Sequence, residues 1–121
     1  MTEIYVPIRI YSEANIQEHW SKKYKRKQMQ KMLISGKLKE KKLPPPPVKI
    51  TLTRIAPREL DYDNLCHALK TPTDIVADHF HPGLAPGRAD GFKDLEFQYS
   101  QKKGKPKEYG LIITICQKND V

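Results

Sequence analysis

The residues best suited to chemistry lie in one short stretch, RELDYDNLCHALK, which covers residues 58 to 70. It places two carboxylates, Asp61 and Asp63, with one residue between them, where a predicted strand gives way to a predicted helix. Carboxylates held this close repel each other, and a cation between them relieves the repulsion. Their hard oxygen atoms are the ligands that Mg²⁺ prefers, with water and phosphate oxygens completing its shell. The pair therefore predicts a Mg²⁺ site for phosphodiester chemistry, in which Mn²⁺ can substitute.

A structural role explains the same two acids. Asp61 and Asp63 stand where the N-terminus of the helix is expected, and carboxylates there are stabilised by the helix dipole. Asp63 and Asn64 are also residue types that cap helices well. The sequence alone leaves the metal site and the helix cap both open.

A polar stripe follows the two acids along the predicted helix. Asp63, His67, Lys70 and Asp74 recur at i, i+4, i+7 and i+11, opposite the leucines. Lys70 or His67 is placed to assist with phosphate charge or protons, and His67, Asp74 and Asn64 are candidates to support the metal ligands. A stripe of this kind is also what an ordinary solvated helix face looks like, so this alternative stays open.

The stretch needs a strand before it and a helix after it, and the flanking sequence supplies both. Residues 48–56 alternate strictly and are rich in β-branched side chains, which predicts a strand. A helix is expected over residues 63–80, either kinked at Pro72 or restarting there with Thr71 as its cap. Residues 81–94 contain three glycines and two prolines and are expected to form a long loop.

The remaining segments complete one α+β domain over residues 1–121. Residues 4–10 predict a strand that Pro7 confines to an edge or a strand end, and residues 95–103 and 109–117 predict a terminal antiparallel hairpin. A helix is expected over residues 18–35, ending at Gly36, with a proline-rich connector at 43–47. The order β-α-β-α-β-β implies one mixed sheet with two helices packed on it. The predicted apolar stripe of the first helix comprises Trp20, Tyr24, Met29, Met32 and Leu33.

Charge and composition narrow the class of partner. The 121 residues carry a formal net charge of +8, which favours a polyanion such as nucleic acid. No segment approaches the roughly 18 apolar residues that span a bilayer, and the N-terminus lacks a signal sequence, so we expect a cytoplasmic protein with no membrane partner. Cys66 and Cys116 lack metal-site spacing and are expected to be buried, reduced thiols. The side chains expected to contact DNA phosphates are Arg58 and the basic run Lys22, Lys23, Lys25, Arg26 and Lys27, for which a merely solvated helix face is the alternative.

The stretch resembles the RusA family of Holliday junction resolvases. The matching pattern is R-x-L-D-x-D-N-L-x-x-A-L-K followed by D-I-V-A-D, from Arg58 to Asp78, and the likeness extends to an aspartate in the glycine-rich loop, here Asp90. The resemblance implies a homodimer that resolves four-way DNA junctions by paired, symmetric nicks in recombination and repair. It also implies Mg²⁺ ligands at Asp61, Asp63 and Asp90. The lysine of some relatives falls at His67, one turn after Asp63, with Lys70 on the same face.

The resulting prediction is a Mg²⁺-dependent, structure-selective endonuclease, a crossover junction endodeoxyribonuclease. The alternative is a junction-binding module of the same fold with weak or no cleavage. A weaker third hypothesis is a general nucleic-acid chaperone or RNA-binding protein, which would show no preference for junctions over duplex.

Overall fold

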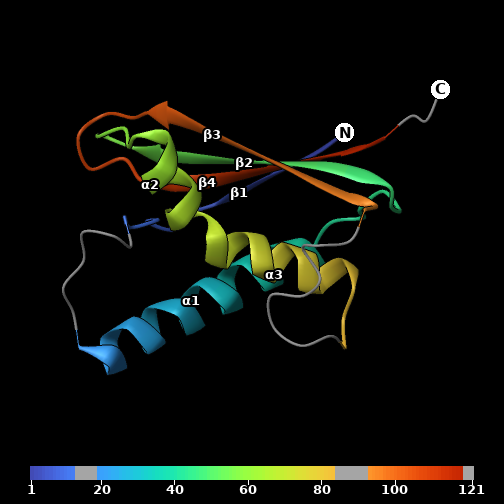
Figure 1. The fold of residues 1–121 in the computed structure, drawn as a ribbon, viewed down its shortest axis with the longest axis horizontal. Helices are drawn as coiled ribbons and strands as arrows, with labels where there is room; N and C mark the ends of the chain where they lie inside the picture. Colours follow the sequence, from blue (N-terminus) through green and yellow to red (C-terminus); the bar gives the residue numbers. More distant parts are fainter. Residues whose placement is uncertain (13–18, 84–92, 119–121) are drawn as a thin grey trace.

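The computed structural model describes residues 1–12, 19–83 and 93–118. One four-stranded mixed sheet, in the order β1-β4-β2-β3, forms the centre of the described chain. All three helices lie on the same side of this sheet (Figure 1). The α+β class and the mixed sheet are therefore confirmed. The elements are β1 (Thr2–Val6), α1 (Trp20–Lys39), β2 (Val48–Ala56), α2 (Tyr62–Ala68), α3 (Lys70–Phe80), β3 (Leu95–Lys103) and β4 (Gly110–Gln117).

The strand β2 lies inside the sheet because its helix-facing side chains are apolar along most of its length. Val48, Ile50 and Leu52 are fully buried there. β2 pairs in parallel with β3 and antiparallel with β4, so it lies between the two C-terminal strands. The predicted hairpin of adjacent β3 and β4 is therefore wrong, although the two strands do run in opposite directions. Alternation identifies a strand but not its neighbour.

The edge position predicted for the first strand is confirmed. β1 pairs only with β4, from Thr2 opposite Ile115 to Val6 opposite Leu111. It ends earlier than expected, at Val6, because Pro7 has no N–H to continue the ladder. The chain turns there, and the Ile8 N–H donates to the Val6 carbonyl at 2.8 Å.

The helix α1 turns a different face to the core than its aromatic residues suggest. Its buried side chains are Gln30, Ile34 and Leu38. The predicted apolar stripe is instead largely exposed, with Trp20 at 74% and Met32 at 63%. Ile34 and Leu38, one turn apart, pack into the core and fix the rotation of the helix. The helix also continues past Gly36 to Lys39.

The single helix expected over residues 63–80 is divided in two. α2 ends at Ala68 and α3 begins at Lys70, with Leu69 at the junction. Pro72 lies in the first turn of α3, where a backbone N–H has no helical acceptor to lose. A break in the predicted helix is therefore confirmed, but α3 begins at Lys70, so Pro72 is not its first residue and Thr71 is not its cap. Thr73 joins the start of α3 to the sheet. Its hydroxyl donates to the Leu69 carbonyl at 2.8 Å and lies 3.2 Å from the hydroxyl of Tyr99 in β3.

No helix in the described ranges is long and apolar enough to cross a membrane. The cytoplasmic location stays a prediction.

The two glycines Gly36 and Gly110 predict opposite effects of an added methyl group. A Cβ at Gly36 meets nothing within 4 Å, so Gly36→Ala should raise the free energy of unfolding by about 0.5–1 kcal/mol, since glycine is unfavourable inside a helix. A Cβ at Gly110 would lie 2.7 Å from the Tyr5 ring, so Gly110→Ala should lower it. Urea unfolding of both variants measures the difference. A loss of stability in Gly36→Ala would contradict the continuous α1.

Candidate metal and nucleic-acid site

Asp61 and Asp63 lie directly after β2, at the start of α2. Asp61 is the N-cap: its carboxylate accepts from the Asn64 backbone N–H at 2.8 Å and from Asn64 Nδ2 at 3.1 Å. Asp63 lies in the first turn, where its charge suits the helix dipole. Both side chains are exposed. The capping role is confirmed for Asp61, and Asn64 donates both hydrogen bonds to its carboxylate.

Two long side chains from the sheet hold the segment that leads into Asp61. Gln101 of β3 makes two hydrogen bonds with the backbone of Leu60: the Leu60 N–H donates to Oε1 at 2.9 Å, and Nε2 donates to the Leu60 carbonyl at 2.6 Å. Arg54 of β2 donates from Nη1 to the Arg58 carbonyl at 2.9 Å. The residue before the first aspartate is therefore fixed to the sheet.

The Asp61–Asp63 pair fits a hard divalent cation in its chemistry. Asp61 uses two acceptor positions for Asn64, and an ionised carboxylate offers about four. Both acids reach solvent, where a cation can keep several waters, as Mg²⁺ usually does. Within the described ranges no group of three or more histidine, cysteine or acidic side chains is arranged to hold a metal ion. The third predicted ligand, Asp90, lies outside the described residues.

The polar stripe predicted after Asp63 is not continuous. His67 is exposed on the last turn of α2, and Lys70 is exposed as the first residue of α3. Asp74 is partly buried and lines a groove of about 520 Å³ between α1 and α3. The break at Leu69 separates the two halves of the stripe. The structure therefore directs Asp74 toward α1 instead of along the face that carries Asp63.

The basic run of α1 is divided among different surroundings. Lys22, Lys23 and Lys25 are exposed, while Lys27 is partly buried and lines the groove between α1 and α3. The guanidinium of Arg26 lies 5.3 Å from the centre of the Tyr11 ring. Only the first three lysines are therefore fully open to a DNA strand.

The same groove contains a histidine, His79, with an altered proton affinity. Partial burial, and next the positive charge of Lys39, lower the pKa of His79 below its ordinary value. Tyr62, the first residue of α2, contacts the Cys66 thiol, and this contact is the main cause that raises the pKa of Tyr62. Cys66 and Cys116 form no disulfide, as predicted, but both are half-buried and not buried as expected.

Sequence reasoning missed a cluster of arginines beside Leu60. Arg9, Arg54 and Arg58 line a cavity of about 310 Å³ that we call the arginine pocket. Arg54 could have been noticed, because position 54 follows 48, 50 and 52 on the buried side of β2, where a charge is unusual. The other lining residues of the arginine pocket are Tyr11, Ser12, Ala56, Pro57, Leu60 and Tyr109.

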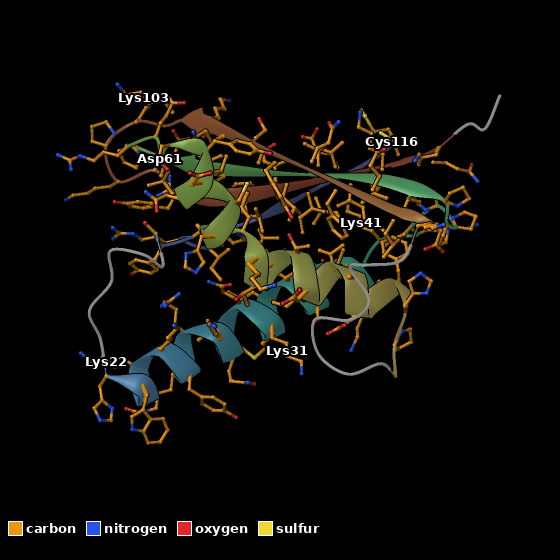
Figure 2. All side chains as sticks on the ribbon, viewed as in Figure 1. Lys22, Lys31, Lys41, Asp61, Lys103 and Cys116 are labelled. Atoms are coloured by element: carbon orange, nitrogen blue, oxygen red, sulfur yellow. The ribbon has the colours of Figure 1, made fainter. Side chains whose placement is uncertain are left out.

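The end of the sheet that carries Asp61 is strongly basic. β2 and β3 run in parallel, so the end of β3 and the turn after it lie beside the end of β2, and the Gly104 N–H donates to the Ala56 carbonyl at 2.8 Å. Figure 2 shows Lys103 and Asp61 at this same end of the molecule. The exposed lysines of β3 and its turn are Lys102, Lys103, Lys105 and Lys107.

The opposite end of the sheet holds a different polar pair. His81, just after α3, and Asp94, just before β3, are hydrogen-bonded, with 3.0 Å between Nε2 and Oδ1. Asp94 stands where β2 begins, because its carbonyl accepts from the Val48 N–H at 2.9 Å. The chain thus re-enters the sheet one full strand length away from Asp61.

Comparisons of the chain with protein-family models, with curated proteins and with solved structures found no match.

Two substitutions of Asp61 separate its role as a cap from its charge. Asp61→Ala should lower the free energy of unfolding by about 1 kcal/mol, because the cap of α2 is lost. Asp61→Asn should leave it nearly unchanged, since asparagine caps about as well. Thermal or urea unfolding near neutral pH gives both values. Equal losses in the two variants would mean that the charge, and not the cap, stabilises α2.

Proposed function

We propose that this protein is a Mg²⁺-dependent endonuclease that cuts branched DNA, with four-way junctions as its substrate. The observation that carries the proposal is the position of Asp61 and Asp63, two exposed carboxylates at the end of β2. Basic side chains of the arginine pocket and of the turn after β3 lie at the same end of the sheet (Figure 2). Acids inside a basic surface suit a cation and a polyanion bound together. The resemblance of the motif to the RusA family supports the same function.

Asp61 and Asp63 would hold the Mg²⁺ ion, with Asp90 as the third ligand that the resemblance implies. When bound, Mg²⁺ supplies Lewis-acid activation of the phosphodiester and of a water molecule. Asn64 orients Asp61 through its two hydrogen bonds. His67 and Lys70, both exposed on the side of α2 and the start of α3, are the candidates to balance phosphate charge or carry a proton.

The direction of the strands bears on the homodimer that we propose. β2 has nine residues, which span roughly 26 Å in a strand. An acid near the start of β3, such as Asp94, therefore lies about one strand length from Asp61 of the same chain. A second subunit could bring an acid from that region to the pair. A two-fold dimer also presents two equivalent sites to the two opposed strands of a junction.

The proposal predicts metal-dependent cleavage that needs both aspartates. Incubation of a labelled synthetic four-way junction with protein and Mg²⁺ should give symmetric nicks. Asp61→Asn and Asp63→Asn should each reduce the cleavage rate by more than about 100-fold, because each removes the charge of a metal ligand. Loss of a residue that only hydrogen-bonds to a metal ligand typically costs roughly 10–100-fold. Denaturing gel electrophoresis resolves the products.

Glu3→Gln is the matched control, because it removes an exposed carboxylate from the edge strand β1. It should cleave at the wild-type rate. Symmetric nicks that persist in Asp63→Asn would refute the metal site.

The exposed lysines at the start of α1 predict salt-dependent binding. Replacing Lys22 and Lys25 together by glutamine should reduce the slope of log affinity against log salt by about 0.9 for each phosphate that the protein then leaves unneutralised. Fluorescence anisotropy with a labelled junction and no Mg²⁺ measures the slope. The control replaces the exposed lysines Lys41 and Lys42, which follow α1 at its other end, and should leave the slope as in wild type. If the variant without Lys22 and Lys25 keeps the wild-type slope of log affinity against log salt, α1 is excluded as a DNA-binding element.

A junction-binding module without efficient cleavage is the second candidate. One feature of the sequence favours it: His67 stands where some members of the family that the motif resembles have a lysine. It differs from the nuclease in one outcome of the cleavage experiment, namely junction binding with no nicks in either Mg²⁺ or Mn²⁺.

A further inference from the structure

The arginine pocket contains a buried positive charge that no acid neutralises in the described chain. Arg54 is 7% exposed, and its Nε donates to the Ile10 carbonyl at 2.9 Å while Nη1 donates to the Arg58 carbonyl. None of the ion pairs found among residues 1–12, 19–83 and 93–118 includes Arg9, Arg54 or Arg58. Burial, and next the like charge of Arg9, lower the pKa of Arg54, which shows that its charged form is held at a cost.

Buried guanidinium groups are normally paired with an anion, and carbonyl oxygens only partly replace one. An arginine remains charged at any physiological pH, so the three arginines cannot reduce their mutual repulsion by losing a proton. The described residues that line the pocket beside Arg9, Arg54 and Arg58 include no acid. The charge balance of the pocket therefore calls for an anion from outside its lining.

The geometry of Arg9 shows which part of it such an anion would meet. Its guanidinium carbon lies 4.5 Å from the centre of the Tyr11 ring and 4.3 Å from that of Tyr109. Contacts with two rings hold the flat group through cation–π attraction. The N–H groups along the edge of the plane are then the part suited to hydrogen bonds. A fixed fork of this kind matches the oxygens of a phosphate group.

The size and place of the pocket indicate a phosphate that belongs to a strand. A volume of about 310 Å³ is roughly ten times the share of one water molecule in the liquid, which leaves room for a phosphate and part of its sugar. Leu60 lines the pocket and immediately precedes Asp61. A strand that passes the two aspartates would therefore place a neighbouring phosphate within reach of the arginines.

We infer that the arginine pocket, through Arg9, Arg54 and Arg58, binds a backbone phosphate of the DNA strand that lies at the Asp61–Asp63 pair. This inference rests on the proposed function for the identity of the strand. The phosphate is held by its charge and its oxygens, so the contact positions the strand without reading its sequence.

Binding without cleavage tests the pocket directly. Anisotropy with a labelled four-way junction in EDTA is measured for Arg9→Met and Arg58→Met, whose side chains are exposed, and for Arg54→Lys, which keeps the charge but loses the fork. Each variant should bind roughly tenfold more weakly or worse, since a hydrogen bond to a charged group is removed. The control Lys41→Gln removes one charge far from Asp61 (Figure 2) and should change the dissociation constant by less than about twofold. Arg9→Met and Arg58→Met binding as tightly as Lys41→Gln would overturn the inference.

A second measurement keeps the pocket and the nuclease apart. The arginine Nε–H signals of the wild-type protein are followed by NMR during titration with inorganic phosphate and with a short single strand of DNA. The Arg54 signal should shift with both ligands, and Arg9→Met should remove most of the shift.

A phosphate-dependent Arg54 shift in a protein that cuts no junction would support the pocket as an anion site and refute the nuclease. If the protein cuts the junction but its Arg54 signal does not shift with phosphate or with single-stranded DNA, the proposed nuclease activity is supported and the proposed phosphate site is refuted.

Discussion

The parallel pairing of β2 with β3 determines where the charged groups of this protein lie. A parallel neighbour requires a crossover, and α2 and α3 provide it on one side of the sheet. The C-terminal ends of β2 and β3 then lie at the same end of the sheet, where Asp61 follows β2 and Lys103 ends β3 (Figure 2). The starts of both strands meet at the other end of the sheet, beside the hydrogen-bonded pair of His81 and Asp94. One pairing thus concentrates the candidate site at a single end of the domain.

Much of the fold followed from periodicity. The alternation of residues 48–56 and 95–103 identified both strands with the bounds that the structure has, and the run at 109–117 was found to within one residue. Which strands are neighbours did not follow, because period-2 patterns describe each strand by itself. The rotation of α1 was also missed, since Trp20 and Tyr24 are larger than Ile34 and Leu38 but do not face the core.

The candidate site was predictable where it is local in sequence. Asp61, Asp63 and Asn64 are neighbours along the chain, so a strand end and a helix start were enough to place them together. The groups that hold them were not predictable, because Gln101 reaches Leu60 across the sheet and Arg54 reaches Arg58 from within it. Asp61 caps α2, but its two hydrogen bonds from Asn64 leave acceptor positions of the carboxylate open. Capping the helix therefore does not prevent Asp61 from binding a metal ion.

The order of strands in the sheet has a consequence for how the chain folds. β1 and β2 are not neighbours, and both pair with β4, so Thr2 meets Ile115 from near the opposite end of the sequence. Contacts so distant along the chain make folding slow, because a long loop closes before they form. During synthesis, β1 therefore waits for β4, whereas β2 can already pair with β3. Arg54, Arg58 and the two acids are close in sequence, but Arg9 follows β1 and joins them only once β4 is in place.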